Sequence, residues 1–286
     1  MTSRPEIVPV ILAGGQGRRL WPLTSPKRPK PFLSLNSGLS FFQRTVLRVR
    51  SFAPPIIVCH HSYRGLVKDH LARVKVEPRA IILEPDHRNT AAAIAMAAFF
   101  LKGQGSLMLV LPSDHSMKNI RAFEKAVVES IAYTIENMVL LGVTPTAAET
   151  DYGYIMLEPG ETACRPVKQF VEKPDEKKAE MLLSLGNCLW NTGMFLSRPS
   201  VFLQQLERAS PGIFEMAQLA YEGRAEKGHF IQPDKKFFSE IEPLSVDYAV
   251  MEKATSYFAR ELNVPWSDVG TLRRLWRWRL KDQGLE

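Results

Sequence analysis

Short apolar runs alternate with longer amphipathic stretches through the first half of the chain. Apolar runs bounded by turn residues predict buried strands, and apolar positions at helical spacing predict helices. Strands are expected at 7–13, 56–59, 80–83, 107–111 and 138–142. Helices are expected at 40–52, 63–74, 90–101 and from a cap at Asn119 to about residue 137. This alternation predicts an α/β fold with a parallel, doubly wound sheet and ligands at the carboxyl ends of the strands.

The second half of the chain has a different pattern, with strands separated by polar turns. These strands are expected at 154–157, 167–171 and 189–196. Helices are expected near 175–185 and from 199 to about 223, and the polar, basic segment 233–240 is expected to be a loop. Residues 271–281 alternate leucines and a tryptophan with arginines at helical spacing. We expect this tail to pack as a terminal helix or as a dimer contact rather than to lie on a membrane.

The composition is ordinary for a soluble globular protein, with 45% hydrophobic and 23% charged residues among 286. Cys59, Cys164 and Cys188 lie far apart and form no C-x-x-C pair, so we expect no disulfide framework, no zinc site and a reducing cytoplasm. No apolar stretch approaches the roughly 20 residues of a membrane span, and no signal peptide is recognisable. The net charge of +7 suits anionic ligands, but no basic run is interleaved with aromatic residues, so no nucleic-acid partner is expected.

The loop LAGGQGRRLWP, from Leu12 to Pro22, follows the first predicted strand and carries the most chemical information. Its glycines let backbone N–H groups approach an anion, and cations beside them neutralise phosphate oxygens. These cations are Arg18, Arg19, Lys27, Arg28 and Lys30. Leu20 stands where a dinucleotide fingerprint needs its third glycine, and the Gly-Lys-Ser/Thr end of a Walker A loop is missing. We interpret the loop as a nucleoside triphosphate site; the alternative is a surface turn with scattered basic residues.

Two aspartates are candidates for a metal site. Asp114 ends a buried strand in the segment Pro112-Ser113-Asp114-His115, and Asp268 lies in a second polar segment near the C-terminus. A carboxylate facing a cationic phosphate loop is well placed to hold Mg²⁺, which proteins usually bind through one or two carboxylates plus phosphate oxygens. A cap or turn role is the alternative for Asp114. We interpret His115 as ordering its loop rather than as a base.

Another polar segment lies between the strand at 80–83 and the apolar helix that follows it. Thr90 is expected to cap this helix, with Arg88 and Asn89 exposed toward the cleft. Their position at a strand end favours ligand contacts.

The second half contains candidate sugar-binding residues. Glu172 and Lys173 combine a carboxylate for sugar hydroxyls with an ammonium for a phosphate; a solvated strand end is the alternative. Asn191 interrupts an apolar strand beside an aromatic residue and a glycine, as amides that bind sugar hydroxyls often do. Gly153 lies between two tyrosines and permits a close approach to a ligand.

These segments occur together and in one order in a known family. They are the glycine loop with Arg19 and Lys30, Glu84-Pro85 with Arg88-Asn89-Thr90, PSDH at 112–115, YGYI at 152–155, FVEKP at 170–174, WNTGMF at 190–195, SVDYA at 245–249 and WSDVG at 266–270. From about residue 8 to 276 the chain resembles the mannose-1-phosphate guanylyltransferases, a family of sugar-1-phosphate nucleotidyltransferases. One such motif is modest evidence, whereas eight in order are strong.

The resemblance implies a Rossmann-like, doubly wound mixed sheet with a sugar-binding lobe. It divides a single domain into a nucleotide-binding half, 1–145, a sugar-phosphate-binding half, 146–270, and a C-terminal helix, 271–286. It implies transfer of GMP from GTP to α-D-mannose 1-phosphate, giving GDP-mannose and pyrophosphate, with Mg²⁺ as cofactor. The alternative is another sugar 1-phosphate or another nucleoside triphosphate. A non-catalytic homologue would lack Lys30, Asp114 or Asp268, all of which are present.

The resemblance also implies roles for individual residues. Arg19 would hold the triphosphate, Lys30 would lie at the reacting α-phosphate, and Asp114 would complete the catalytic set. The nucleotide would be bound by Leu12, Ala13, Gly14, Gly15, Gly17, Arg19, Arg88, Asn89, Thr90, Pro112, Ser113 and Asp114. The sugar phosphate would be bound by Gly153, Glu172, Lys173 and Asn191. Asp114 and Asp268 would bind Mg²⁺.

The chain departs from the family at three positions. Arg18, Pro31 and Ala92 stand where the family usually has threonine, glutamine and proline. Long family members carry an additional isomerase domain, for which this chain is too short, so transferase activity alone is expected. Trp276 and Trp278 in the tail are compatible with a homodimer.

Overall fold

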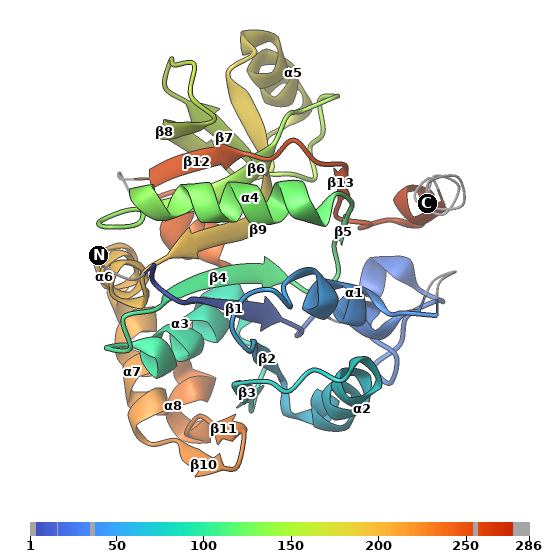
Figure 1. The fold of residues 1–286 in the computed structure, drawn as a ribbon, viewed down its shortest axis with the longest axis vertical. Helices are drawn as coiled ribbons and strands as arrows, with labels where there is room; N and C mark the ends of the chain where they lie inside the picture. Colours follow the sequence, from blue (N-terminus) through green and yellow to red (C-terminus); the bar gives the residue numbers. More distant parts are fainter. Residues whose placement is uncertain (1–3, 16, 35–37, 254–256, 277–286) are drawn as a thin grey trace.

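The computed structural model describes residues 4–15, 17–34, 38–253 and 257–276. A large mixed sheet with the order β10-β11-β3-β2-β1-β4-β9-β6-β12-β8-β7 runs through the molecule (Figure 1). Its strands are β1 (Ile7–Leu12), β2 (Ile56–His60), β3 (Ala80–Glu84), β4 (Leu107–Pro112), β6 (Met138–Val143), β7 (Tyr154–Leu157), β8 (Cys164–Val171), β9 (Cys188–Ser197), β10 (Ala225–Lys227), β11 (Phe230–Gln232) and β12 (Tyr257–Glu261). A separate small sheet joins β5 (Ser116–Met117) and β13 (Trp266–Ser267).

The strands predicted in the first half form a parallel core, with one exception. β1 pairs in parallel with β2 and β4, and β2 pairs in parallel with β3. The parallel sheet expected from the strand–helix pattern does not continue to β6, because β9 lies between β4 and β6 and is antiparallel to both. β9 is largely buried, and a buried strand needs hydrogen-bonding neighbours on both edges. The mixed sheet implied by the resemblance is confirmed.

Helices cover both faces of the sheet, so the doubly wound arrangement is also confirmed. One face packs against α1 (Phe41–Arg48), α2 (Arg64–Val74), α4 (Ile120–Ser130) and α5 (Glu176–Leu185). The other face packs against α3 (Asn89–Leu101), α6 (Pro199–Ala209), α7 (Pro211–Glu222) and α8 (Lys235–Glu240). The side chains of β1 alternate between these layers, with Val8 and Val10 on the α3 side and Ile7 and Ile11 on the α1 side.

The N-terminus of α3 differs from the prediction. Thr90 does not cap the helix but lies in its first turn, after Arg88 at the cap position. The Thr90 hydroxyl instead accepts a hydrogen bond of 2.8 Å from the backbone N–H of Val246. This bond ties a segment of the second half to the strand ends of the first.

Two other boundaries also differ. Segment 233–240 is not a loop throughout, because α8 occupies most of it. The Asp234 side chain accepts hydrogen bonds from the backbone N–H groups of Lys236 and Phe237, and Phe238 is fully buried. One cap and one buried anchor stabilise a turn too short to show helical periodicity. The helix expected to reach residue 137 ends at Ser130 and continues only as a 3-10 turn, Ile131–Tyr133.

The C-terminal region packs against the glycine loop. Figure 1 shows β1 and β4 pointing to the side on which β5, β13 and the C-terminal segment lie. Residues 272–276 are helical, and the rest of the predicted tail helix, from residue 277, lies outside the described residues. Leu275 is buried with Leu20, Leu33, Phe41 and Val269. The functional division at residue 145 stays a prediction, although strands from both parts share one sheet.

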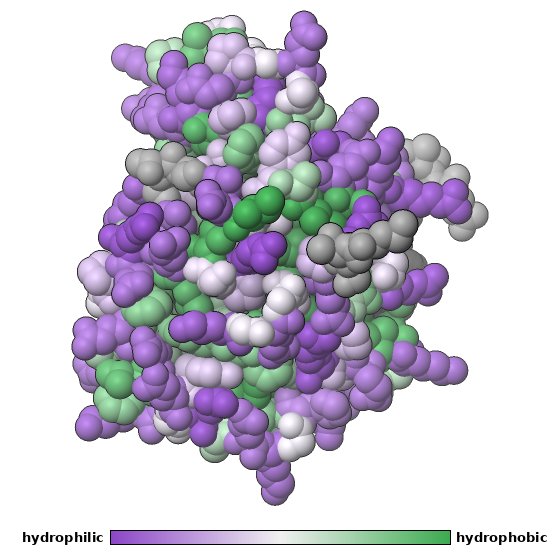
Figure 2. Space-filling model, turned by 60° about the vertical axis from the view of Figure 1, so that its left-hand side comes forward, coloured by the Kyte–Doolittle hydropathy of each residue, from purple (hydrophilic) through white to green (hydrophobic). Residues whose placement is uncertain are grey.

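Figure 2 shows hydrophilic residues over most of one face, with apolar residues gathered in a band near its middle. In the part of the chain that the structure describes, no helix combines the length and apolar character needed to cross a membrane.

Candidate active site

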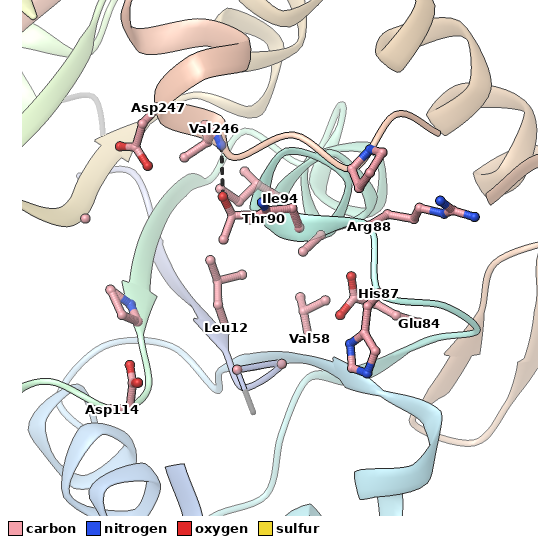
Figure 3. Close-up of a pocket in the computed structure, with 17 residues that line it drawn as sticks. Leu12, Val58, Glu84, His87, Arg88, Thr90, Ile94, Asp114, Val246 and Asp247 are labelled. Carbon is pink, nitrogen blue, oxygen red and sulfur yellow. Dashed lines mark hydrogen bonds between the residues drawn. The ribbon is translucent and has the colours of Figure 1, made fainter. Parts of the chain in front are cut away.

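The carboxyl ends of β1, β3 and β4 open onto a cavity of about 560 Å³ (Figure 3). Apolar side chains from distant segments form much of its wall: Leu12, Val58, Ala93, Ile94, Pro243 and Val246. In Figure 3, Glu84 and His87 lie at one end of the cavity, and Asp114 and Asp247 lie at the other. An apolar slot with polar ends suits a flat ring joined to a charged group.

Most of the predicted nucleotide-binding residues line this cavity, but four do not. The lining residues are Leu12, Gly14, Gly15, Arg88, Asn89, Thr90, Pro112 and Asp114. Ala13 and Ser113 are buried behind the wall, where the Ala13 amide donates to the Val58 carbonyl and the Ser113 hydroxyl donates to the Leu12 carbonyl. They hold the strand ends together. The other two, Gly17 and Arg19, belong to the glycine loop beside the cavity.

The glycine loop brings Lys30 inward and leaves Arg19 at the surface. Gly17 has a φ of +65°, and a β-carbon there would lie 2.5 Å from the β-carbon of Lys30. Glycine is therefore required both for the backbone conformation and for the close approach. Two 3-10 turns, Arg18–Leu20 and Lys30–Phe32, complete the loop. Arg19 is exposed, with its Nη1 atom 3.9 Å from Asp151.

Lys30 is buried between the two aspartates predicted to bind metal. Its Nζ atom lies 2.9 Å from Oδ2 of Asp114 and donates a 2.6 Å hydrogen bond to the backbone carbonyl of Asp268. Burial acts to raise the pKa of Asp114, but the lowering effects, of which the charge of Lys30 is the largest, outweigh burial and hold that pKa below its ordinary value. Asp114 is therefore an ionised carboxylate beside an ammonium group.

This donor set offers a divalent cation two carboxylates, and water or a bound ligand would complete its coordination. Among the described residues, no group of three or more histidine, cysteine, aspartate or glutamate side chains comes together as a metal site. Asp114 places its carboxylate beside the Lys30 ammonium, whereas Asp268 contacts Lys30 through its backbone carbonyl and directs its carboxylate to Tyr152 and Arg274. Mg²⁺ is commonly held by one or two carboxylates plus phosphate oxygens, so the two aspartates fit Mg²⁺ when a nucleotide supplies the rest.

His115 has the surroundings of a structural residue. Burial is the main reason that its pKa is lowered, to about 4, so the ring is neutral near pH 7. The ring packs edge-on against Trp266 at 5.5 Å, and the His115 carbonyl accepts a hydrogen bond from Arg48. These contacts hold the loop that carries Asp114.

The four predicted sugar-phosphate residues lie together near Asp247. Nδ2 of Asn191 donates a 2.9 Å hydrogen bond to Oδ1 of Asp247, and Lys173 contacts Glu172 at 2.7 Å. A β-carbon on Gly153 would lie 2.6 Å from Oε2 of Glu172 and 3.3 Å from Cβ of Asn191. Burial, and next the charge of Glu172, raise the pKa of Asp247 to about 6. Because Asp247 also lines the cavity, this group continues the site at one end.

The structure adds three residues that the sequence analysis left without a role. Glu84 is a buried carboxyl in the cavity wall, and burial raises its pKa to about 8. Asp247 begins the π-helical turn Asp247–Met251. Arg274 contacts Asp268 from the C-terminal segment. Glu84 and Asp247 lie in two segments that carry the family resemblance, which is the signal that could have identified them, whereas Arg274 lies outside those segments.

A doubly wound sheet with a cationic glycine loop at its strand ends defines an α/β protein of the nucleotide-binding class. The model of the nucleotidyl transferase family matches residues 8–283, and the chain belongs to this family. Members of the family generally use a divalent metal ion.

Individual relatives agree with this assignment. The chain is 41% identical over 286 residues to the alginate biosynthesis protein AlgA of Pseudomonas putida, with 96% of this chain and 59% of AlgA covered. It is 37% identical over 288 residues to the mannose-1-phosphate guanylyltransferase of Escherichia coli, with 96% and 62% covered. The chain thus spans about three fifths of the length of these relatives. A solved structure from Thermus thermophilus, described as a mannose-1-phosphate geranyltransferase, has a TM-score of 0.84 at 31% identity, covering 95% of this chain and 78% of that one.

Proposed function

We propose that this chain transfers GMP from GTP to α-D-mannose 1-phosphate, forming GDP-mannose and releasing pyrophosphate. The observation that carries the proposal is the position of Lys30, buried between Asp268 and Asp114, of which Asp114 lines the same cavity as Asp247. The activity named for the Escherichia coli relative supports the choice of base and sugar.

The proposed reaction is an in-line displacement that needs no general base. A phosphate oxygen of mannose 1-phosphate attacks the α-phosphorus of GTP, and the bond to the α,β-bridging oxygen breaks as pyrophosphate leaves. The attacking oxygen is already anionic at neutral pH, so these residues act by positioning and by neutralising charge. Lys30 would serve the α-phosphate and Arg19 the triphosphate. A magnesium ion held by Asp114 and Asp268 would neutralise further phosphate charge.

Glu84 is the proposed determinant for guanine. Guanine presents two donors, N1–H and the N2 amino group, on one edge, and a carboxylate can accept both. The Glu84 carboxyl lines the cavity away from Asp114, so a base lying along the apolar wall would bring that edge toward it. Charge-assisted hydrogen bonds of this kind are about twice as strong as neutral ones.

GTP binding is therefore expected to release a proton. The pKa of about 8 leaves Glu84 mostly protonated near pH 7 in the free protein, and two accepted hydrogen bonds favour its ionised form. Because binding releases a proton, the affinity for GTP rises with pH and levels off above about 8. Calorimetry in buffers of different ionisation enthalpy measures that proton.

Glu84→Gln is expected to remove this proton release and to lower kcat/KM for GTP by about 10- to 100-fold, the value of a hydrogen-bond pair to a charged group. The exposed Glu77 provides a matched control as Glu77→Gln. An unchanged pH dependence in Glu84→Gln would exclude Glu84 from base recognition.

Gly153→Ala is expected to weaken sugar-phosphate binding and to lower the free energy of unfolding by about 1 to 3 kcal/mol. The new methyl group would lie 2.6 Å from Oε2 of Glu172 and 3.1 Å from Cζ of the buried Phe170, so both side chains must shift. We expect KM for mannose 1-phosphate to rise by about tenfold, the effect of losing about 1.4 kcal/mol of binding, with KM for GTP unchanged. Gly65→Ala in α2 is the control, since a β-carbon there meets nothing within 4 Å. Equal KM values for both variants would argue against a sugar site at Gly153.

The overall test is a substrate panel. Four nucleoside triphosphates are combined with several sugar 1-phosphates, and pyrophosphate release is measured. The highest kcat/KM is expected for GTP with mannose 1-phosphate. A higher value for another pair would change the assigned substrates, and no release from folded protein would reject the function. The homodimer stays a prediction. Light scattering tests it by measuring the molar mass of the protein in solution.

A further inference from the structure

Arg274 connects the proposed metal site to a loop of the second half. Its guanidinium lies 2.5 Å from Oε2 of Glu149 through Nη2, and 3.2 Å from Oδ2 of Asp151 through Nη1. The same Nη1 atom lies 3.4 Å from both carboxylate oxygens of Asp268. One planar guanidinium thus contacts carboxylates from two segments that are far apart in the sequence.

Tyr152 makes a second connection between these segments. Its hydroxyl donates a 2.9 Å hydrogen bond to Oδ1 of Asp268, and its ring lies 4.6 Å from the Arg274 guanidinium carbon. Gly153 follows directly, and its carbonyl accepts a 2.8 Å hydrogen bond from the backbone N–H of Asn191. The position of Asp268 is therefore coupled, through Arg274 and Tyr152, to the residues proposed to hold the sugar phosphate.

The backbone at Arg274 is held in place by the C-terminal helical segment. Leu275 is buried beside Leu20 of the glycine loop, and the Arg274 backbone N–H donates to Oγ1 of Thr271 at 3.3 Å. The Arg274 and Asp268 side chains are only 15% and 14% exposed, so their interaction is weakly screened by solvent. The 2.5 Å contact with Glu149 is much shorter than the 3.4 Å contacts with Asp268, so Arg274 can release Asp268 while staying bound to Glu149.

We propose that Arg274 is a positioning residue. In the free protein it neutralises the charge of Asp268 and keeps the 149–153 loop in place. When substrates bind, it releases the Asp268 carboxylate, which then binds the divalent metal. Without Arg274, the carboxylates of Glu149, Asp151 and Asp268 would lose the guanidinium that all three contact, and the exposed Arg19 lies 3.9 Å from Asp151. Mutual repulsion would then move the loop away from the site. The proposal rests on the proposed function for its kinetic consequences, but its effect on metal binding can be measured without substrates.

The first test uses Arg274→Met, which keeps an unbranched side chain and removes the charged guanidinium, with the exposed Arg273→Met as the control. Thermal unfolding is recorded without nucleotide, in EDTA and in millimolar MgCl₂. Because Mg²⁺ takes over the neutralisation of Asp268, we expect it to raise the melting temperature of Arg274→Met at least about twice as much as that of the wild type. An equal response of the two proteins would overturn the proposal.

For a second variant, we expect the response of the melting temperature to Mg²⁺ to change in the opposite direction. In Glu149→Gln, Arg274 loses its shortest contact and is free to pair more closely with Asp268. The melting temperature of Glu149→Gln should therefore respond to MgCl₂ less than that of the wild type. A response of Glu149→Gln equal to or larger than the wild-type response would contradict the proposed competition, and this variant remains informative if Arg274→Met fails to fold.

Kinetics separate positioning from a general loss of stability. Arg274→Met is expected to lower kcat by about 10- to 100-fold with little change in KM for GTP, as misplacement of reacting groups does. Arg274→Lys should recover stability but not turnover, because one ammonium cannot replace a two-sided contact. Full recovery of turnover by lysine would overturn the positioning role. If the wild type makes no GDP-mannose but the melting shifts appear, the proposed function fails and the Arg274 contact network stands.

Discussion

Lys30→Met is expected to reduce turnover by about 10³- to 10⁵-fold, the range attributed to single cationic groups in phosphoryl transfer. The ammonium of Lys30 is buried and held by Asp114 and by the backbone carbonyl of Asp268, and in the proposed mechanism it lies at the α-phosphate. The α-phosphate of GTP already carries one negative charge, and further negative charge develops on it and on the leaving pyrophosphate in the transition state, so kcat should fall more than the affinity for GTP. Steady-state kinetics with GTP and mannose 1-phosphate measure both parameters.

The control for this variant is Lys27→Met. Lys27 lies in the same cationic loop but is exposed, so its removal should change turnover by less than about tenfold. Circular dichroism and thermal unfolding establish that Lys30→Met keeps its fold. Turnover of folded Lys30→Met within about tenfold of the wild type would remove Lys30 from the mechanism.

Asp114→Asn is expected to lower turnover by about 10³-fold, equivalent to several kcal/mol of lost charge stabilisation at the metal. The residual activity should respond only weakly to Mg²⁺, because the variant has lost a proposed carboxylate ligand. Mg²⁺ titration of the variant and the wild type measures this response. A steep response in the variant would show that other residues hold the ion.

The same variant tests the electrostatics of the free protein. Asparagine leaves the buried Lys30 without its carboxylate partner. The free energy of unfolding of Asp114→Asn should therefore be about 3 kcal/mol lower than that of the wild type at neutral pH. The folded pKa of Asp114 lies below its ordinary value, so the stabilisation is present above that value and is lost as pH falls through the folded pKa. The difference in the free energy of unfolding between Asp114→Asn and the wild type should therefore become smaller at acidic pH. Asp69→Asn, at an exposed site on α2, is the control.

Local pattern was enough for most of the parallel half of the fold. The strand Ile7–Leu12 and the apolar helix Asn89–Leu101 lie where the runs of apolar residues predicted them. Their neighbours in the sheet follow succession in the chain only in part: β1, β2 and β3 lie side by side, whereas β4 follows β3 in the chain but pairs with β1. The predicted ligand-binding edge followed, since polar segments such as 112–115 come directly after these strands.

Contacts between distant segments could not be predicted from the local sequence pattern. The insertion of β9 between β4 and β6 depends on which sheet edge is free, and local periodicity carries no information about that. The cap of Asp234 and the burial of Phe238 similarly override the polar composition of segment 233–240.

The sequence by itself determined the glycine loop, the Asp114 strand end and the pairing of Glu172 with Lys173 as chemical features, because each depends on residues that are neighbours in the chain. Only the tertiary structure decided that Lys30 lies between Asp114 and Asp268, that Glu84 faces an apolar cavity, and that Arg274 reaches Asp268. The physical reason is that charge and burial act through space. Residues far apart in the chain can share one desolvated site, and their pKa values and contacts follow from packing rather than from spacing.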